Sequence, residues 1–100
     1  MAKEVIMTPI ALSDFRNVVN YLTYKWGITA TNSFIDRFEK VTVLLSENAG
    51  IYPFFDKAKQ LQKCVITKHN ILYFIETEAV VKILFVFDTR QDPKKLSSLI

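Results

Sequence analysis

The stretch that decides the fold is VVKILFVF, residues 80–87, which is followed at once by the polar segment DTRQDPKKL, residues 88–96. Residues 80–87 are apolar at all but one position, as is typical of a central strand with both faces covered. The polar segment would then bring Arg90, Lys94 and Lys95 to one edge of the sheet. Because guanidinium and ammonium groups can neutralise phosphate oxygens together, this edge is a candidate phosphate-binding site.

Two further β-rich runs precede this strand, so that the second half of the chain holds runs at residues 61–67, 71–76 and 79–87. The links between them are short enough for hairpin turns, which predicts a three-strand antiparallel meander. Residues 51–60 show no clear period and contain Pro53. We therefore expect an ordered loop there.

The first half of the chain predicts one short strand and two helices. Residues 3–7 are the strand candidate, and Thr8 can cap a helix whose first turn holds a proline. Apolar residues recur at helical spacing over residues 15–26 and again over residues 34–45, with Gly27 as a natural stop between them. Two helices joined by so short a link form a hairpin.

The expected fold is a single α+β domain of residues 1–100, with an N-terminal strand, a two-helix hairpin and then the meander. The hairpin would cover one face of a four-stranded sheet, with its second helix starting at Thr29 or Thr31 and ending near residues 48–50. A small domain with apolar residues on both sheet faces must cover the second face as well. A protein partner is the simplest cover.

Composition excludes several classes of protein. Half of the 100 residues are apolar, and only 2 are glycine and 3 proline, so the chain should fold. No apolar window is long enough for a membrane span or a signal peptide, and the single Cys64 suits a reducing compartment, so the cytoplasm is expected. One histidine and one cysteine cannot make a zinc site, and the isolated glycines form no phosphate loop. We therefore expect neither a metal nor a cofactor.

The positive charge lies in the second half of the chain. The net charge is +3, but residues 57–100 carry eight lysines and arginines against four acidic residues, a net +4. This imbalance indicates a polyanionic or acidic partner for that half, although ordinary solvated lysines would give the same count.

Four features of the sequence are shared with one known family: the order of elements, the residues that open and close the first helix, one run across the first hairpin of the meander, and the tail after the last strand. The residues concerned are Ala11, Asp14, Tyr21, Tyr24 and Trp26, the run Lys63 to Tyr73, and the tail Phe87 to Leu96. Together they resemble the RelE/ParE superfamily of toxins from type II toxin–antitoxin systems, and the tail resembles in particular a branch of the Bacteroidetes type.

This resemblance implies one of two activities on one scaffold. RelE-like members cut mRNA on the ribosome without a metal, whereas ParE-like members inhibit DNA gyrase and have no hydrolytic chemistry. In both, a cognate antitoxin wraps a segment around the toxin and masks its basic face. The implied partners are therefore an antitoxin and either the ribosome with mRNA or DNA gyrase, with no membrane involved.

The resemblance also implies a tentative catalytic set. Arg90 matches the arginine that would stabilise charge on the scissile phosphate, and Lys63 stands where the family usually has arginine. Lys68 and His69 follow in a turn, where His69 could act as a general acid or base or be only a solvated polar residue. Tyr73 could contact a base, although core packing explains it equally simply. Lys94 and Lys95 join the phosphate-binding candidates.

Three hypotheses follow from the sequence. The first, slightly preferred, is a ribosome-dependent, metal-independent mRNA endoribonuclease neutralised by its antitoxin. The second is a gyrase inhibitor without hydrolytic activity. The third is a degenerate toxin that only binds its antitoxin, which the lysine at position 63 and the missing acid or base after Arg90 would explain. The proposed phosphate chemistry depends on the cations at positions 63, 68 and 90 converging in one pocket that an anionic ligand could occupy.

Overall fold

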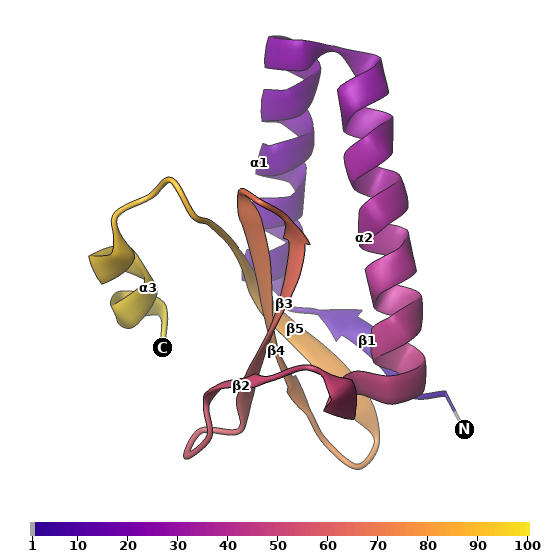
Figure 1. The fold of residues 1–100 in the computed structure, drawn as a ribbon, viewed down its shortest axis with the longest axis vertical. Coiled ribbons are helices and arrows are strands. Elements are labelled where there is room, and N and C mark those ends of the chain that lie inside the picture. The colour runs from indigo at the N-terminus through magenta and orange to yellow at the C-terminus, as the bar shows by residue number, and fades with distance from the viewer. Residues whose placement is uncertain (1) are drawn as a thin grey trace.

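The computed structural model describes residues 2–100 as an α+β domain in which two long helices pack on a five-stranded sheet (Figure 1). In chain order the elements are β1 (Glu4–Met7), α1 (Pro9–Trp26), α2 (Ile28–Asn48), the short 3-10 helix η1 (Ala49–Ile51), β2 (Phe54–Asp56), β3 (Leu61–Thr67), β4 (Asn70–Glu76), β5 (Val80–Asp88) and α3 (Pro93–Leu99).

The sheet has the strand order β1-β5-β4-β3-β2. β5 lies between the parallel β1 and the antiparallel β4, which confirms the prediction of a central strand for residues 80–87. β3, β4 and β5 form the predicted antiparallel meander. The expectation of four strands was wrong by one, because Phe54–Asp56 pairs with the start of β3 inside the predicted loop.

The helical hairpin is held by its caps. The Thr8 hydroxyl accepts a hydrogen bond from the backbone N–H of Ala11 at 3.0 Å and donates to the carbonyl oxygen of Leu84 at 2.6 Å, which fixes the start of α1 against β5. Gly27, with φ of 91°, ends α1 and immediately precedes α2. The second helix therefore begins at Ile28, earlier than either threonine that was expected to start it.

The main core lies between the helical hairpin and the sheet. Three phenylalanine rings interlock there, with ring centroids 4.7 Å apart for Phe15 and Phe38 and 5.8 Å apart for Phe15 and Phe34. Beneath them Leu72 and Phe74 of β4 have no exposed surface. Burial of these large apolar side chains is the main source of stability for a domain of this size.

The second sheet face carries a smaller core that the chain itself partly covers. Leu61, Tyr73, Phe85 and Phe87 are buried there, and Leu96 of α3 and Ile100 pack against them. The sequence predicted a protein partner as the cover, and it did not predict α3. In Figure 1 this helix stands apart from the helical hairpin, to the left of the sheet.

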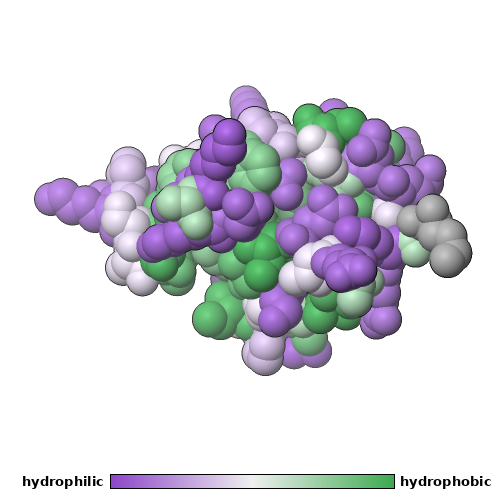
Figure 2. Space-filling model, turned by 90° about the horizontal axis from the view of Figure 1, so that it is seen from below, coloured by the Kyte–Doolittle hydropathy of each residue, from purple (hydrophilic) through white to green (hydrophobic). Residues whose placement is uncertain are grey.

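The described residues at the end of the molecule opposite the tip of the helical hairpin mix hydrophobic and hydrophilic groups. Figure 2 shows this end of the molecule, where hydrophobic groups form several separate patches among hydrophilic ones. Within residues 2–100, no helix combines the length and the apolar character needed to cross a membrane.

Candidate binding cavity

One large open cavity, of about 1140 Å³, lies where the two long helices meet the ends of β3, β4 and β5. Its wall is apolar on the side of the helices, and charged side chains come from the ends of the strands and from the following segment. The apolar lining residues are Ile10, Val18, Leu22, Trp26, Ala30, Phe34, Val86, Phe87 and Leu99. The acidic and basic ones are Asp14, Arg37, Lys68, His69, Asp88, Arg90 and Lys95.

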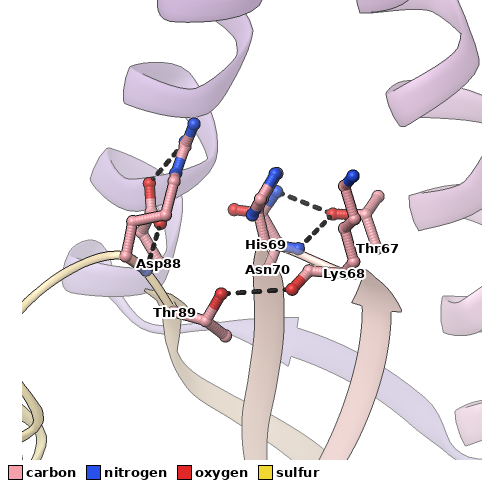
Figure 3. Close-up of polar contacts among 7 residues, drawn as sticks. Thr67, Lys68, His69, Asn70, Asp88 and Thr89 are labelled. Carbon is pink, nitrogen blue, oxygen red and sulfur yellow. Dashed lines mark hydrogen bonds and ion pairs between the residues drawn. The ribbon is translucent and has the colours of Figure 1, made fainter.

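The turn between β3 and β4 forms one edge of this cavity (Figure 3). The Thr67 hydroxyl oxygen accepts hydrogen bonds from the backbone N–H of His69 at 3.3 Å and from the side-chain amide of Asn70 at 3.0 Å. Thr89 secures the turn from outside, because its N–H donates to the carbonyl of His69 and its hydroxyl to the carbonyl of Lys68. These bonds hold Lys68 and His69 at the cavity.

Arg90 is held at the mouth of the cavity by two neighbours. Its Nε and Nη2 donate to the two carboxylate oxygens of Asp88 at 3.0 and 2.8 Å, in the bidentate geometry that suits a guanidinium. Its guanidinium carbon also lies 5.3 Å from the centroid of the Tyr21 ring. The hydrogen bonds from Arg90 lower the pKa of Asp88, and those to Asp88 raise the pKa of Arg90. Asp88 therefore already neutralises much of the cation proposed for phosphate binding.

Two further charged groups line the cavity from the helices. Asp14 accepts a hydrogen bond from the backbone N–H of Val86 at 2.9 Å, and burial raises the pKa of its carboxyl group despite that bond. Arg37 of α2 donates to the carbonyl oxygen of Ile66 at 3.1 Å. The sequence suggested neither Arg37 nor the Tyr21–Arg90 contact as part of a site. No local sequence pattern predicts which helix face packs against the end of a distant strand.

The structure brings together only some of the predicted site residues. Lys68, His69, Arg90 and Lys95 line the cavity, whereas Lys63, Tyr73 and Lys94 do not. The expected convergence of the cations at positions 63, 68 and 90 is therefore wrong for position 63.

The reason is the alternation of side chains along a strand. Lys63 and Tyr73 are directly paired across β3 and β4, so both point to the sheet face away from the two long helices. There the Lys63 ammonium lies 5.9 Å from the centroid of the Phe55 ring. Tyr73 is 2% exposed and stacks on Phe85, with ring centroids 4.9 Å apart, and burial raises its pKa. Core packing is the role these contacts indicate for Tyr73.

Metal ligation has no group of residues to support it. Over residues 2–100 there is no cluster of three or more histidine, cysteine, aspartate or glutamate side chains that could hold an ion. The two aspartates at the cavity are engaged by Val86 and Arg90.

Comparison with known protein families assigns most of the chain to one family. The family model described as the ParE toxin of the type II toxin–antitoxin system, parDE, matches residues 5–93. The chain therefore belongs to the ParE toxin family. No curated protein matches it in sequence.

Solved structures share the fold at low sequence identity. A chain of the chromosomal ParDE TA system from P. aeruginosa is 10% identical, with a TM-score of 0.73 over 87% of this chain and 96% of the other. YoeB from Staphylococcus aureus, solved as a dimer, is 10% identical, with a TM-score of 0.63 over 87% and 97%. YafQ from E. coli is 12% identical, with a TM-score of 0.62 over 88% and 94%. The Bacteroidetes-type branch stays a prediction.

Proposed function

We propose that this ParE-family toxin is neutralised by a cognate antitoxin and acts in the cytoplasm on DNA gyrase, by binding and without cleaving a nucleic acid. The observation that carries the proposal is the separation of the candidate catalytic residues. Lys63 and Tyr73 lie on one sheet face, while Lys68, His69 and Arg90 lie at the cavity on the other side. Groups on opposite faces of a sheet cannot act on one scissile phosphate.

The side chains that line the cavity are poorly suited to RNA cleavage. Metal-free cleavage needs a base for the 2′-hydroxyl and an acid for the leaving oxygen, each within hydrogen-bond reach of its atom. His69 is the one histidine in the chain. Tyr73 is buried in the smaller core on the other sheet face. Arg90 is occupied by Asp88, whose carboxylate also repels an approaching phosphate. A binding protein needs none of these groups to be free.

An antitoxin partner is supported by the family and by the cavity. The type II family is defined as one half of a toxin–antitoxin pair. YafQ and YoeB, which share the fold, have each been solved with an antitoxin, DinJ and YefM. An open cavity with apolar walls and a mixed charged rim suits an amphipathic protein segment.

The two modes of action are separated by one experiment in growing cells. After induction of the chain, mRNA ends are mapped in parallel with the supercoiling of a reporter plasmid. We expect altered supercoiling with intact mRNA, and we expect co-expression of the antitoxin to restore growth. New mRNA ends within codons at the ribosomal A site, with normal supercoiling, would contradict the proposal.

The second candidate function is the ribosome-dependent endoribonuclease. The observation in its favour is that Lys68, His69, Arg90 and Lys95 line one cavity, which gathers positive charge and an imidazole. It predicts that Arg90→Ala abolishes translation-dependent cleavage. The third reading, a degenerate toxin, predicts neither RNA cleavage nor a change in supercoiling, with antitoxin binding retained.

A further inference from the structure

The lysines and arginines that line the cavity outnumber its carboxylates. The cations are Arg37, Lys68, Arg90 and Lys95, and the carboxylates are Asp14 and Asp88. Asp88 holds Arg90 through two hydrogen bonds. Burial raises the pKa of Asp14, while the Val86 hydrogen bond and the positive charge of Lys95 lower it, so Lys95 acts on that carboxylate. Each carboxylate of the cavity therefore already has a cation, and two cations have none.

These two cations, Arg37 and Lys68, are open to a partner. Neither forms an ion pair with any of residues 2–100. Both are exposed residues that line the cavity, so an incoming group can reach them without displacing packed side chains. Two neighbouring positive charges without a carboxylate attract an anion to this part of the cavity.

The end of β3 places the two cations on the same side of the cavity. Nη1 of Arg37 donates to the carbonyl oxygen of Ile66 at 3.1 Å, which uses one of the five donors of the guanidinium. Lys68 follows Ile66 by two positions, which span at most about 7 Å of chain. The Thr89 hydroxyl fixes the main chain there by donating to the Lys68 carbonyl, and Figure 3 shows the Lys68 side chain extending beyond the end of β3. One anionic group can therefore meet both cations.

We propose that Arg37 and Lys68 form a carboxylate-binding subsite at the β3 end of the cavity, which takes one aspartate or glutamate side chain of the antitoxin. The planar guanidinium suits the two oxygens of a carboxylate, and the lysine ammonium adds a point charge. This inference rests on the proposed antitoxin binding. It names the contact that fixes the register of the bound segment in the cavity.

The surroundings of this subsite favour a protein carboxylate over the phosphates of RNA. The wall that α1 and α2 contribute carries aliphatic and aromatic side chains, among them Val18, Leu22 and Phe34. An amphipathic protein segment can cover such a wall with its apolar face while one acidic side chain reaches the cations. A run of phosphates would also meet the carboxylates of Asp14 and Asp88, which repel it.

Substitutions at position 37 separate the charge from the hydrogen bond to Ile66. Arg37→Gln removes the charge and keeps a side-chain amide that can donate to that carbonyl, whereas Arg37→Lys keeps the charge. Lys40→Glu is the matched control for Arg37→Glu, because Lys40 is exposed on the same helix outside the cavity. Titration calorimetry of each full-length variant with the purified cognate antitoxin gives the dissociation constants, and circular dichroism melts establish that each variant is folded.

The loss of affinity should follow the charge at position 37. We expect Arg37→Gln to weaken antitoxin binding about tenfold and Arg37→Glu at least about thirtyfold. Arg37→Lys should lose less than Arg37→Gln, and Lys40→Glu should stay within about threefold of the wild type. If Arg37→Gln does not fold, Lys68→Gln in the exposed turn supplies the same comparison.

A double variant tests whether the two cations hold the same group. Independent contacts would make the fold-losses of Arg37→Gln and Lys68→Gln multiply to within about twofold in the double variant. If both side chains bind one carboxylate, the first substitution already loosens it, so the second costs less. We expect the double variant to lose at least about threefold less affinity than the product of the two single losses.

Several results would overturn the inference. Wild-type affinity in Arg37→Gln and Lys68→Gln would show that neither charge contacts the antitoxin, and multiplying losses would show that they bind separate groups. Equal losses in Arg37→Glu and Lys40→Glu would mean that only net charge counts. Binding of a single-stranded RNA of about 12 nucleotides that Arg37→Gln abolishes, with antitoxin affinity unchanged, would assign the cations to nucleic acid. Failure of the proposed function is recognised separately, because the wild-type chain would then not bind the antitoxin at all.

Discussion

Asp14 of α1 and Val86 of β5 are joined by a hydrogen bond of 2.9 Å from the Val86 N–H to the Asp14 carboxylate, across 72 positions of the chain. Val86 is buried, so its N–H has no access to water as an alternative acceptor. The bond fixes the helix that forms one wall of the cavity to the central strand that forms another. It makes Asp14 a structural residue of the cavity as well as a lining one.

Removal of this acceptor should destabilise the fold. Asp14→Ala leaves the Val86 N–H buried and unpaired, and we expect a loss of about 1–3 kcal/mol in the free energy of unfolding. Asp14→Asn keeps an acceptor without a desolvated charge and should lose clearly less. Urea unfolding at neutral pH measures both variants. Equal losses in the two would mean that the carboxylate charge, and not the hydrogen bond, is what matters.

The ion pair between Asp88 and Arg90 should make stability depend on acidic pH. Because the pair lowers the pKa of Asp88 below its ordinary 3.8, the carboxylate contributes stability above that value and loses it as pH falls through the folded-state pKa. We expect Asp88→Asn to be destabilised at neutral pH by less than about 1 kcal/mol, since the pair is partly exposed. Urea unfolding from pH 7 to pH 2 should show this difference disappearing at the acidic end.

A constant difference between Asp88→Asn and the wild type over that range would contradict the assignment. Asp14 changes the pH dependence of stability in the opposite direction to Asp88. Its raised pKa means that the folded state binds the proton more tightly, so its contribution to stability grows as pH falls through the raised value towards 3.8. The comparison with Asp88→Asn cancels this background.

Gly27 should not tolerate a side chain, for a reason that lies in the backbone alone. Its φ of 91° and ψ of −177° are a conformation that residues with a Cβ rarely adopt, yet an added Cβ would meet no atom within 4 Å. We expect Gly27→Ala to cost about 1–3 kcal/mol in thermal or urea unfolding. Gly50→Ala is the matched control, because Gly50 has no positive φ and should change stability little. Similar losses at both positions would refute the backbone explanation.

Lys63 and Lys68 should differ in their effect on antitoxin binding, although each carries one positive charge on the same strand or its turn. Lys68 lines the cavity and Lys63 lies over Phe55 on the other face. Lys68→Ala should weaken binding several-fold at low salt, with the difference shrinking as salt screens the charge. Lys63→Ala should bind like the wild type. Calorimetry at two salt concentrations measures this, and equal losses would mean that only net charge counts.

The sequence predicted the long elements because their periodicity is local. The helical stripes, the meander and the unbroken apolar run of β5 each identify an element without knowledge of its neighbours. The sequence did not predict β2, because this strand is three residues long and pairs with β3 through an irregular register. The sequence did not predict α3 either, because seven mostly polar residues show little helical periodicity. The signals present were Asp92 as the cap and Pro93 as the first residue of the helix.

The cation-rich end of β5 was recognisable in the sequence, since Arg90 and Lys95 follow the strand and do line the cavity. What the residues could not decide was the side of the sheet for Lys63 and Tyr73. That choice depends on which face the two helices cover and on the register of β3 against β4, and both are set by packing between segments far apart in the chain. The sequence by itself determined the long elements and the charge near the last strand. Only the tertiary structure decided which of these side chains share a cavity. Alternation along a strand shows which side chains lie on the same face of the sheet, but packing of the two helices decides which face that is.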